Sequence, residues 1–443
     1  MQTYVDDKGH KVIKPQPGPQ TDFCSSPAQI IIYGGAAYGG KFQPLDSLIS
    51  TPFGFRPMGS MKIGSQISNP DGSVQRVIAI WPQGFKRVWK ITCDDGSTCE
   101  AGEDHLWVYR IGRDQRKTEN QWLVGDTKEL IKRLNKGYSA IIPLPEAVQF
   151  TLPSHLRNRY PIDPYFLGVL IGDGSLRKHA VNVTSADYEI ISRIPVKYSR
   201  ADQKPGNKAW SYHYKWEDIK CLEDLGLIGK HSNDKFVPEI YKYASIDIRL
   251  EILRGMMDTD GYVSDRGHTS YTTVSEILAK DVQFIARSLG YTASIATKIP
   301  TFRYKGEKKK GQLAYTVYIG GKDASFIVTL QRKKNRSINK QKRDRAIVSI
   351  VESRVTETQC ITVDHPNGQY ITNDFIVTHN SVGLLIEASR NVRKDRYQVS
   401  IKEGISLDQS FILVHSCRKK AELKPFFRPI LEIAKHKIIG GNL

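Results

Sequence analysis

The stretch Gly34–Lys41 (GGAAYGGK) decides how the chain is organised. It follows the apolar, β-branched run Ile30–Tyr33, which predicts a buried strand that enters a tight loop. Loops of the form G-x-x-x-x-G-K-[ST] need this order, because their glycines let backbone N–H groups wrap phosphate and their lysine reaches the outer phosphate oxygens. The fixed positions are filled by Gly35, Gly40 and Lys41. The stretch therefore predicts most of a nucleotide-binding loop.

The last position of this loop is missing, because Phe42 offers no hydroxyl for Mg²⁺. A hydroxyl occurs much later, at Ser381 in the stretch VTHNSVGLLIEASRNV (377–392). Joining Lys41 to Ser381 completes the motif and places a predicted helix directly after it, which is the strand–loop–helix context that such a loop requires. The sequence thus predicts an ATP- and Mg²⁺-binding loop that is interrupted by residues 42–380.

The composition indicates a polyanionic partner. The 443 residues carry 65 Lys+Arg against 46 Asp+Glu, a formal net charge of +19, which favours nucleic acid over a merely well-solvated surface. Residues 298–345 hold 15 of these cations against three acids, and tyrosines are interleaved with them. This pattern is typical of β-ribbons that lie on DNA phosphates. A solvated linker remains the alternative for 331–345.

The six cysteines form no CxxC pair, so zinc and thioredoxin-like sites lack support, and they are too sparse for a disulfide framework. No apolar run is long enough to span a membrane, and the first residues lack an apolar signal core. We therefore expect a cytoplasmic protein with no membrane partner.

The tripeptide His379-Asn380-Ser381 resembles the C-terminal boundary of an intein, a segment that excises itself from a protein. An Asn side-chain amide can attack its own carbonyl and cleave the bond that follows, with the adjacent His moving the proton. A Ser hydroxyl can hold an acyl group and pass it to its own freed amine. The resemblance implies these roles here. An ordinary surface loop is the alternative for so short a motif.

The N-terminal boundary lacks the usual Cys or Ser nucleophile, since Phe42 stands there. The segment 96–109 (GSTCEAGEDHLWVY) resembles the intein block whose His polarises the scissile amide, and His105 matches that His. In this block a Thr usually stands three residues before the His, and Gly102 occupies that position here. With Trp107, Cys360 and Thr378 at three further block positions, the chain resembles class 3 inteins. Each residue taken alone would be an ordinary packing or hydrogen-bonding residue.

The resemblance implies a mechanism in four steps. Cys360 attacks the carbonyl of Lys41 while His105 helps the Phe42 nitrogen to leave. The acyl group moves from the Cys360 thioester to Ser381, Asn380 cyclises with the help of His379, and an O-to-N shift leaves a Lys41–Ser381 peptide bond. No cofactor is implied for splicing. Trp107 and Thr378 would complete the site.

The resemblance also implies the fold, an α+β multi-domain chain. Short β-rich runs with DG and NP turns fit a horseshoe-shaped Hint splicing domain made of 42–147 and 346–380. Residues 148–345 would form an inserted α/β endonuclease domain. Segments 1–41 and 381–443 would be the flanking P-loop ATPase fragments, the second one truncated or divergent.

Two segments inside 148–345 resemble the LAGLIDADG motif of homing endonucleases, FLGVLIGDG (166–174) and LRGMMDTDG (253–261). Each predicts an apolar helix whose central Gly lets the two helices approach closely. The helix ends would bring Asp173 and Asp260 together as Mg²⁺ ligands for phosphodiester hydrolysis. Two motifs imply a monomeric enzyme on an asymmetric double-stranded DNA site. We expect Lys298 to be the basic residue beside the metal site.

The flanks resemble a phage large-terminase ATPase, through GPQTDFCSS (18–26) and the loop described above. We therefore expect a phage or prophage gene in a bacterial host, with the uninterrupted terminase gene as the DNA target. Two alternatives stay open. One is a splicing-dead relic that retains only the endonuclease, and the other is a P-loop ATPase with an inert insert.

Overall fold

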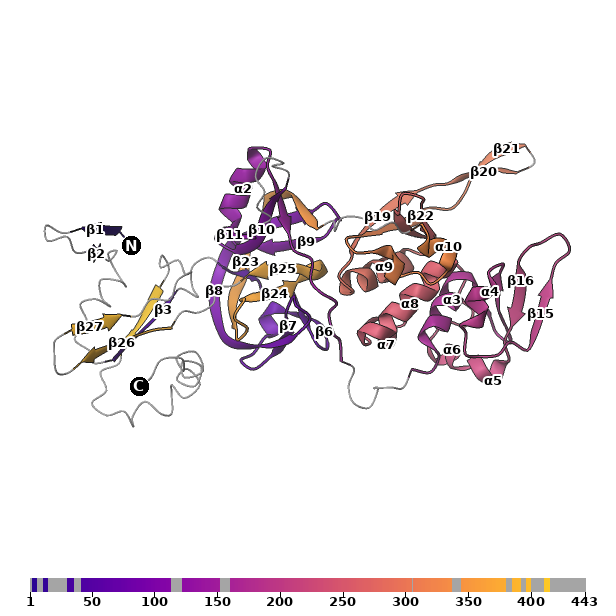
Figure 1. Ribbon diagram of the computed structural model, residues 1–443, viewed down its shortest axis with the longest axis horizontal. Helices are drawn as coiled ribbons and strands as arrows, with labels where there is room; N and C mark the ends of the chain where they lie inside the picture. Colours follow the sequence, from indigo (N-terminus) through magenta and orange to yellow (C-terminus); the bar gives the residue numbers. More distant parts are fainter. Residues whose placement is uncertain are drawn as a thin grey trace.

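The computed structural model describes residues 41–112, 122–151, 160–304, 306–336 and 344–379, and also the backbone of six strands in the flanks. The flanking strands are β1 (Gln2–Val5), β2 (Lys11–Lys14), β3 (Ile30–Gly35), β26 (Leu385–Asn391), β27 (Arg396–Val399) and β28 (Ser410–Val414). Figure 1 shows a β-rich body built from both ends of the central segment, followed by a body that contains most of the helices. Among the described residues no helix is long and apolar enough to cross a membrane.

The β-rich body depends on two long strands, β8 (Val74–Cys93) and β23 (Arg345–Val363), which pair antiparallel along almost their whole length. They belong to a ten-stranded sheet with the order β24-β25-β10-β12-β23-β8-β7, to which β11, β4 and β9 are attached at its sides. The remaining elements are β4 (Gln43–Pro44), β5 (Leu48–Thr51), β6 (Gly54–Pro57), β7 (Gln66–Ser68), β9 (Thr98–Ala101), β10 (Leu106–Gly112), β11 (Leu123–Asp126), α2 (Thr127–Asn135), β12 (Ser139–Ile142), β24 (Gln369–Thr372) and β25 (Ile376–His379). Strands from 42–147 and 346–380 therefore share one sheet.

The helical body contains the same unit twice. In the first unit α3 (Pro164–Asp173) leads into a sheet of four strands in the order β13-β14-β16-β15. In the second unit α8 (Ile246–Thr259) leads into a sheet in the order β17-β18-β22-β19. Once the hairpin β20–β21 is left out, both sheets follow the chain order 1-2-4-3. The strands are β13 (Gly174–Arg177), β14 (Ala180–Ser185), β15 (Arg200–Gln203), β16 (Trp210–His213), β17 (Gly261–Val263), β18 (Thr269–Thr273), β19 (Thr292–Lys298), β20 (Thr301–Tyr304), β21 (Glu307–Lys310) and β22 (Ala314–Gly320).

Six further α-helices complete the described part of this body. The two long apolar helices form the centre of one continuous core, which confirms the two predicted helices at 166–174 and 253–261. A further helix follows the second strand of each unit, α4 in the first and α9 in the second. The helices are α4 (Tyr188–Ser192), α5 (Trp216–Ile219), α6 (Cys221–Asp224), α7 (Glu239–Lys242), α9 (Glu276–Ser288) and α10 (Gln331–Lys334).

Two glycines let α3 and α8 touch backbone to backbone. A Cβ placed on Gly168 would fall on the carbonyl oxygen of Ile252, and one placed on Gly255 would fall on the carbonyl oxygen of Tyr165. These contacts lie between rigid helix backbones, so neither helix can yield locally. The predicted reason for a small residue at the centre of each motif is therefore confirmed.

The flanking segments differ from the prediction. The helix expected for 382–392 is wrong where the structure describes it, because Leu385–Asn391 forms β26 and pairs antiparallel with β3. Gly35 is the last residue of β3 and pairs with Ser410 of β28. As long as Lys41 is not joined to Ser381, no completed loop exists to start a helix, and the β-prone segment pairs with a strand instead. Gly40 lies outside the described residues.

We predict that Gly168→Ala lowers the free energy of unfolding of the helical body by about 1–3 kcal/mol, because the added methyl group forces the α3 and α8 backbones apart. Chemical denaturation followed by circular dichroism at the helix band measures this. Gly320→Ala is the matched control, since a Cβ there meets only the Thr292 hydroxyl at 3.1 Å. Equal stability of the two variants would contradict the close packing.

Candidate functional site

The register of β4 against β23 places the Lys41–Phe42 bond beside Cys360. Gln43 pairs with Gln359 at the end of this antiparallel ladder, so Phe42 and Cys360 are the residues that adjoin the last pair on the two strands. Cys360 is 1% exposed and Phe42 is 6% exposed, so both lie inside the β-rich body. Bulk water therefore reaches these two side chains poorly, which limits hydrolysis of any acyl intermediate formed on the sulfur.

The two residues that follow the Lys41–Phe42 junction are held from several sides. Tyr370 donates a hydrogen bond from its hydroxyl to the Gln43 side-chain oxygen at 2.8 Å, and Gln43 Nε2 donates to the carbonyl of Glu100 at 3.2 Å. The backbone N–H of Gly102 donates to the Phe42 carbonyl at 2.9 Å. At the position where inteins usually have Thr, Gly102 thus still contributes a backbone contact. These bonds fix the chain on the C-terminal side of the junction.

His105 lies between the junction and β25. Its Nε2 atom hydrogen-bonds the hydroxyl of Thr378, and both residues are fully buried. Burial lowers the pKa of His105 to about 3, although hydrogen bonding with the Lys41 backbone acts in the opposite direction. The Nδ1 atom has no well-aligned partner among the described residues. The ring is therefore neutral at pH 7, and its second nitrogen is left for the scissile peptide.

Trp107 supports the turn that carries His105. Its Nε1 donates to the hydroxyl of Thr127 at 3.0 Å, and that hydroxyl in turn donates to the Gly102 carbonyl at 2.8 Å. The Trp107 and His105 rings meet edge to face, with centroids 5.1 Å apart. Thr127 is the N-terminal residue of α2 and is fully buried, and no sequence motif marks it as part of this site. Trp107 is thus a positioning residue for the His105 turn.

The last two strands bring His379 to the same place. Leu106 pairs with His379 across β10 and β25, next to His105. Burial lowers the pKa of His379 to about 4, with a further contribution from the Lys41 ammonium. Cys360, His105, Trp107, Thr378 and His379 therefore gather round the junction. The next two predicted residues, Asn380 and Ser381, lie outside the described residues.

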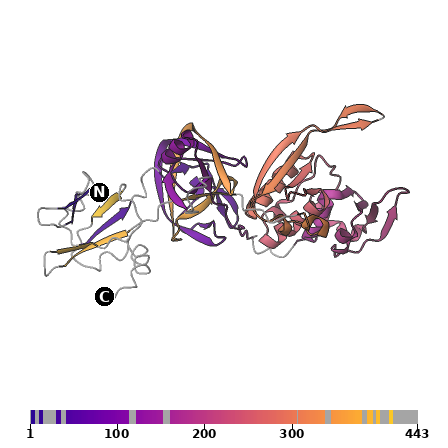
Figure 2. The ribbon, with the colours of Figure 1, turned by 45° about the horizontal axis from the view of Figure 1, so that its top comes forward.

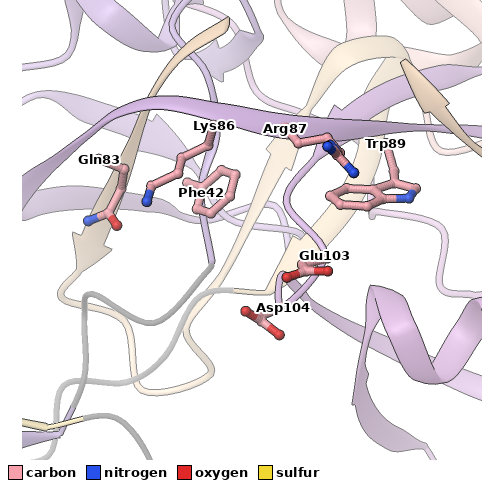
Figure 3. A pocket seen from close by; sticks show the side chains of 7 residues that line it. All are labelled: Phe42, Gln83, Lys86, Arg87, Trp89, Glu103 and Asp104. Atoms are coloured by element: carbon pink, nitrogen blue, oxygen red, sulfur yellow. The ribbon is translucent and has the colours of Figure 1, made fainter. Parts of the chain in front are cut away.

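An open recess of about 300 Å³ adjoins the junction (Figure 3). Phe42 lies at its centre, and Lys86 and Arg87 of β8 lie above it in the view of Figure 3. The carboxylates of Glu103 and Asp104, which directly precede His105, lie on the opposite side. The remaining lining residues are Gln83 and Trp89. Charged groups of both signs thus surround the residues at the boundary.

A second candidate site lies where α3 and α8 end. Asp173 is the last residue of α3 and Asp260 is the C-cap of α8, and their carboxyl groups share a hydrogen bond. Desolvation raises the pKa of both groups, and the neighbouring Asp173 charge helps to raise that of Asp260 to about 6. Both side chains also reach solvent, so water screens part of this repulsion. The predicted meeting of the two carboxylates is observed.

Two buried lysines accompany the pair. Lys235 Nζ donates to the carbonyls of Gly172 and Gly174, at 2.8 Å each, at the end of α3. Lys333 Nζ donates to the carbonyls of Met257 at 2.6 Å and Gly261 at 2.7 Å, at the end of α8. Burial lowers the pKa of each lysine to about 8, while nearby carboxylates act in the opposite direction. Each repeat therefore supplies one lysine to the C-terminal end of its central helix.

Lys298, the basic residue expected from the sequence, lies elsewhere. It is exposed at the end of β19 and pairs with Ala314, whereas Lys235 and Lys333 are the lysines whose charges act on Asp173 and Asp260. The geometry therefore does not favour the role predicted for Lys298. Lys235 begins the run KFVPEI (235–240), which leads into α7 and the second central helix. The two lysines occupy equivalent positions, each after the last strand of its repeat, and comparing the two repeats could have identified them.

Buried hydrogen bonds fix the segments that carry these lysines. Asp258 accepts from the Tyr165 hydroxyl at 2.9 Å and from the Thr329 backbone at 2.7 Å, four residues before Lys333. The Ser275 hydroxyl donates to the carbonyl of Lys235 itself at 2.8 Å. Asp258 was not selected from the sequence, because an acidic residue inside an apolar helix gives no clue to its partners. Its role is to hold the lysine segment.

The carboxylate pair fits a Mg²⁺ ion. Two adjacent oxygen donors that repel each other gain from a shared cation, and Mg²⁺ commonly takes one or two carboxylates, with water and substrate phosphate completing its shell. Among the described residues no cluster of three or more His, Cys, Asp or Glu side chains is present. Asp173 and Asp260 could therefore supply two of the oxygen ligands of such an ion.

Comparisons with known proteins agree with parts of this geometry. Residues 247–329 match the family described as LAGLIDADG-like domain, which covers α8 and the second repeat, including Asp260. The first repeat lies outside this match, and its likeness to the second repeat follows from the shared strand order.

The curated relatives include two proteins named replicative DNA helicase DnaB. The one from Mycobacterium intracellulare is 26% identical over 87% of this chain and 66% of its own length. The one from Synechocystis sp. is 33% identical over 35% of this chain and 20% of its own length. The chain thus spans just under two thirds of the first relative and a fifth of the second. Among solved structures, a variant of the gp41-1 intein is 10% identical, with a TM-score of 0.24, and covers 77% of this chain and 100% of its own.

The mycobacterial match bears on the flanks. Residues 42–380 make up less than 87% of the chain, so this match includes part of the flanking segments. Neither relative is named a terminase, and the predicted terminase host is therefore not supported by these matches.

We predict that Asp260→Asn raises the free energy of unfolding by about 1 kcal/mol at pH 8 without metal, after allowance for solvent screening. The pKa of Asp260 is raised in the folded state, so wild type loses stability as pH rises from about 4 to 6 and stays less stable above. The gain should therefore vanish at pH 4. Chemical denaturation at both pH values measures it, with exposed Asp234→Asn as the control. A loss of stability at pH 8 would contradict the repulsion.

Proposed function

We propose that this chain is an intein with a LAGLIDADG homing endonuclease, and that it excises residues 42–380 and joins Lys41 to Ser381. The observation that carries the splicing half is the register of β4 on β23, which brings Cys360 and the residue after the junction to the same end of the ladder. The similarity to the LAGLIDADG-like domain and the duplicated unit support the endonuclease half.

The first step would use groups that already surround the junction. The Cys360 sulfur attacks the Lys41 carbonyl carbon, and the thiol proton passes to His105 and then to the Phe42 nitrogen as the peptide bond breaks. Because burial depresses the pKa of His105 to about 3, the ring does not hold the proton as a stable imidazolium but relays it to the leaving amine while the C–N bond breaks. Thr378 holds the opposite ring nitrogen. Preorganised groups in a buried site replace a bimolecular encounter.

The later steps follow from the boundary residues of the sequence. The Ser381 hydroxyl takes the acyl group from Cys360, which releases the thiol. The Asn380 amide nitrogen then attacks its own carbonyl, so that the bond to Ser381 breaks and the Ser381 amine is freed. His379, neutral at pH 7 because burial lowers its pKa to about 4, would accept and return the proton. The amine finally takes the acyl group from the Ser381 oxygen.

The endonuclease half would cut double-stranded DNA as a monomer with two related units. Asp173 and Asp260 would hold Mg²⁺, which supplies an activated water and stabilises the leaving oxygen. The hairpin β20–β21 projects from the helical body (Figures 1 and 2) and carries Lys308, Lys309 and Lys310, all exposed. Its charge favours contacts with DNA phosphates, which position the duplex.

The host protein would be a P-loop ATPase, since joining Lys41 to Ser381 restores the loop. The relatives named as replicative helicases, one of which also matches part of the flanks, favour a helicase of that kind over the terminase expected from the sequence. The DNA target would then be the uninterrupted host gene at the Lys–Ser codons.

We predict that wild-type protein, but not Cys360→Ala, yields an excised 42–380 fragment together with a ligated product of 1–41 and 381–443. Intact-mass spectrometry on the two proteins expressed side by side measures this. Cys221→Ala, a half-buried thiol in the helical body, is the matched control and should splice normally. Unspliced chain from wild type would contradict splicing and leave the endonuclease-only alternative, while equal splicing by Cys360→Ala would contradict the assigned nucleophile.

We predict that Asp173→Asn and Lys235→Met each reduce DNA cleavage about 100-fold or more, because both groups act at the cutting site. The substrate is a plasmid that carries the uninterrupted host site, with and without Mg²⁺. Lys298→Met removes the same charge from an exposed position and should change the rate of cleavage by less than about threefold when DNA is saturating. A larger loss in Lys298→Met than in Lys235→Met would restore the residue first expected from the sequence.

A further inference from the structure

The turn that leads into β25 has a backbone conformation that one of its residues does not favour. The segment Asn373–Phe375 joins β24 to β25, and within it Asp374 and Phe375 have φ angles of 56° and 58°. Two successive positive φ angles suit a hairpin turn, where Asn, Asp or Gly normally supplies them. A bulky aromatic residue is rare in this region, so contacts from outside the turn must stabilise the conformation.

The turn matters because it fixes the register of the strand that follows. β24 and β25 pair on either side of it, and β25 then carries Thr378 and His379. The Thr378 hydroxyl is hydrogen-bonded to Nε2 of His105, and His379 pairs with Leu106 of β10. A shift of the turn would move both residues of β25 relative to these partners. The conformation of the turn therefore bears on the splice site.

One helix of the inserted domain contacts both residues of the turn. Phe284 and Arg287 lie three positions apart on α9 and therefore share a face of that helix. The Phe284 ring meets the Phe375 ring edge to face, with centroids 5.2 Å apart. Arg287 Nη1 donates to the Asp374 carboxylate at 2.8 Å, and Nη2 donates to the carbonyl of Asp95 at 2.9 Å. α9 thus holds the two residues that have positive φ angles.

This contact is buried and directional. Arg287 is 3% exposed and Phe375 is 1% exposed, so both side chains belong to the packed interior. A planar guanidinium whose donors engage two different segments fixes orientation as well as distance. The Asp374 carboxylate also accepts from the Thr98 backbone at 2.9 Å, so both bodies define its position. α9 therefore supports the turn from one side while the β-rich body supports it from the other.

We propose that Arg287 is a positioning residue for splicing, and that the inserted domain, through α9, assists the steps that depend on β25. The inference rests on the proposed splicing function and deepens it. Cys360 owes its place to β23 and its pairing with β4, to which the turn does not belong. His379 owes its place to β25, so the cyclisation of Asn380 depends on α9 more than the attack by Cys360 does.

The β-rich body supplies contacts of its own, which limit the size of the effect. Arg345 Nη1 donates to the Phe375 carbonyl at 3.0 Å. The Phe55 ring meets the Phe375 ring with centroids 4.9 Å apart. These contacts keep the turn in place when α9 contributes less. Loss of the Arg287 contact should therefore slow a step of splicing and leave the fold intact.

The test follows two stages of the reaction in the full-length chain. The excised fragment 42–380 reports the cyclisation of Asn380. Hydroxylamine releases residues 1–41 from a thioester or an ester, and so reports intermediates that have passed the first acyl transfer but have not been resolved. Mass spectrometry quantifies both species over time.

The variants separate the contact from a general loss of stability. Arg287→Met removes the charge, Arg287→Lys keeps it, and Asp374→Asn removes the partner charge while its side-chain oxygen can still accept from the Thr98 backbone. A double variant combines Arg287→Met with Asp374→Asn. Arg254→Met is the matched control, since Arg254 donates to the Phe326 carbonyl at 2.7 Å and to Glu251 at 2.6 Å, both within the inserted domain.

We expect Arg287→Met to slow the appearance of 42–380 about tenfold, because a small misplacement of reacting groups is costly, while the intermediate forms within about threefold of the wild-type rate and accumulates. Arg287→Lys should slow excision only about threefold, since it retains the charge beside Asp374. Asp374→Asn should resemble Arg287→Met, and the double variant should be no slower than either, because residues that act through one contact are not additive. Arg254→Met should splice at the wild-type rate.

Three results would count against the inference alone. They are wild-type excision by Arg287→Met, equal slowing of both stages, and additive losses in the double variant. Equal slowing would mean that less of the chain is folded, and additive losses would mean that Arg287 does not act through Asp374. If the wild-type chain yields neither 42–380 nor releasable 1–41, the proposed splicing function fails, and this inference fails with it.

Discussion

The antiparallel pairing of β8 with β23 is the constraint on which the rest of the structure depends. It joins segments that are more than 250 residues apart in sequence, with Cys93 next to Ile347 at one end and Val77 next to Val363 at the other. Bringing such distant segments together is entropically unfavourable, and the length of the ladder and the cores on its faces compensate for it. Once the ladder forms, β4 adds to β23 and Cys360 faces the junction. The chemistry is thus a consequence of register.

The same register explains how a second domain can be inserted without disturbing the first. Ile142 at the end of β12 pairs directly with Arg345 at the start of β23. The chain therefore leaves the sheet and returns to it at neighbouring positions, where an insertion imposes little strain. Inside the insertion the Gly168–Gly255 contact plays the corresponding role, because it sets the distance between the two helix ends and hence between their carboxylates.

The sequence allowed prediction of those features that depend on residue type at short range. Apolar helices with a central glycine, the paired acids at their ends and the boundary tripeptide could all be recognised locally. The lysines at the helix ends could not, because Lys235 lies about 60 residues after its carboxylate and meets it only through the fold. The expected helix after Ser381 failed for a related reason: its start requires a bond that the unspliced chain lacks, and Leu385–Asn391 pairs with β3 instead. The support of Trp107 by Thr127 was equally invisible, since it arises from a turn.

Two buried arginines, one from each body, bond the segment that leads into β25. Arg287 of α9 donates to the Asp374 carboxylate at 2.8 Å and to the Asp95 carbonyl at 2.9 Å. Asp374 lies just before β25, the strand that carries Thr378. Arg345, however, comes from the β-rich body itself and is fully buried, and it bonds the Asp95 carboxylate and the Phe375 carbonyl at 3.0 Å each. The β-rich body therefore has its own clamp on the same two segments, and the inserted domain adds a second one. Because the bonds of Arg345 do not pass through the insertion, the β-rich fold anchors the strand that carries Thr378 and His379 by itself, and the inserted domain reinforces an arrangement that the β8–β23 ladder already defines.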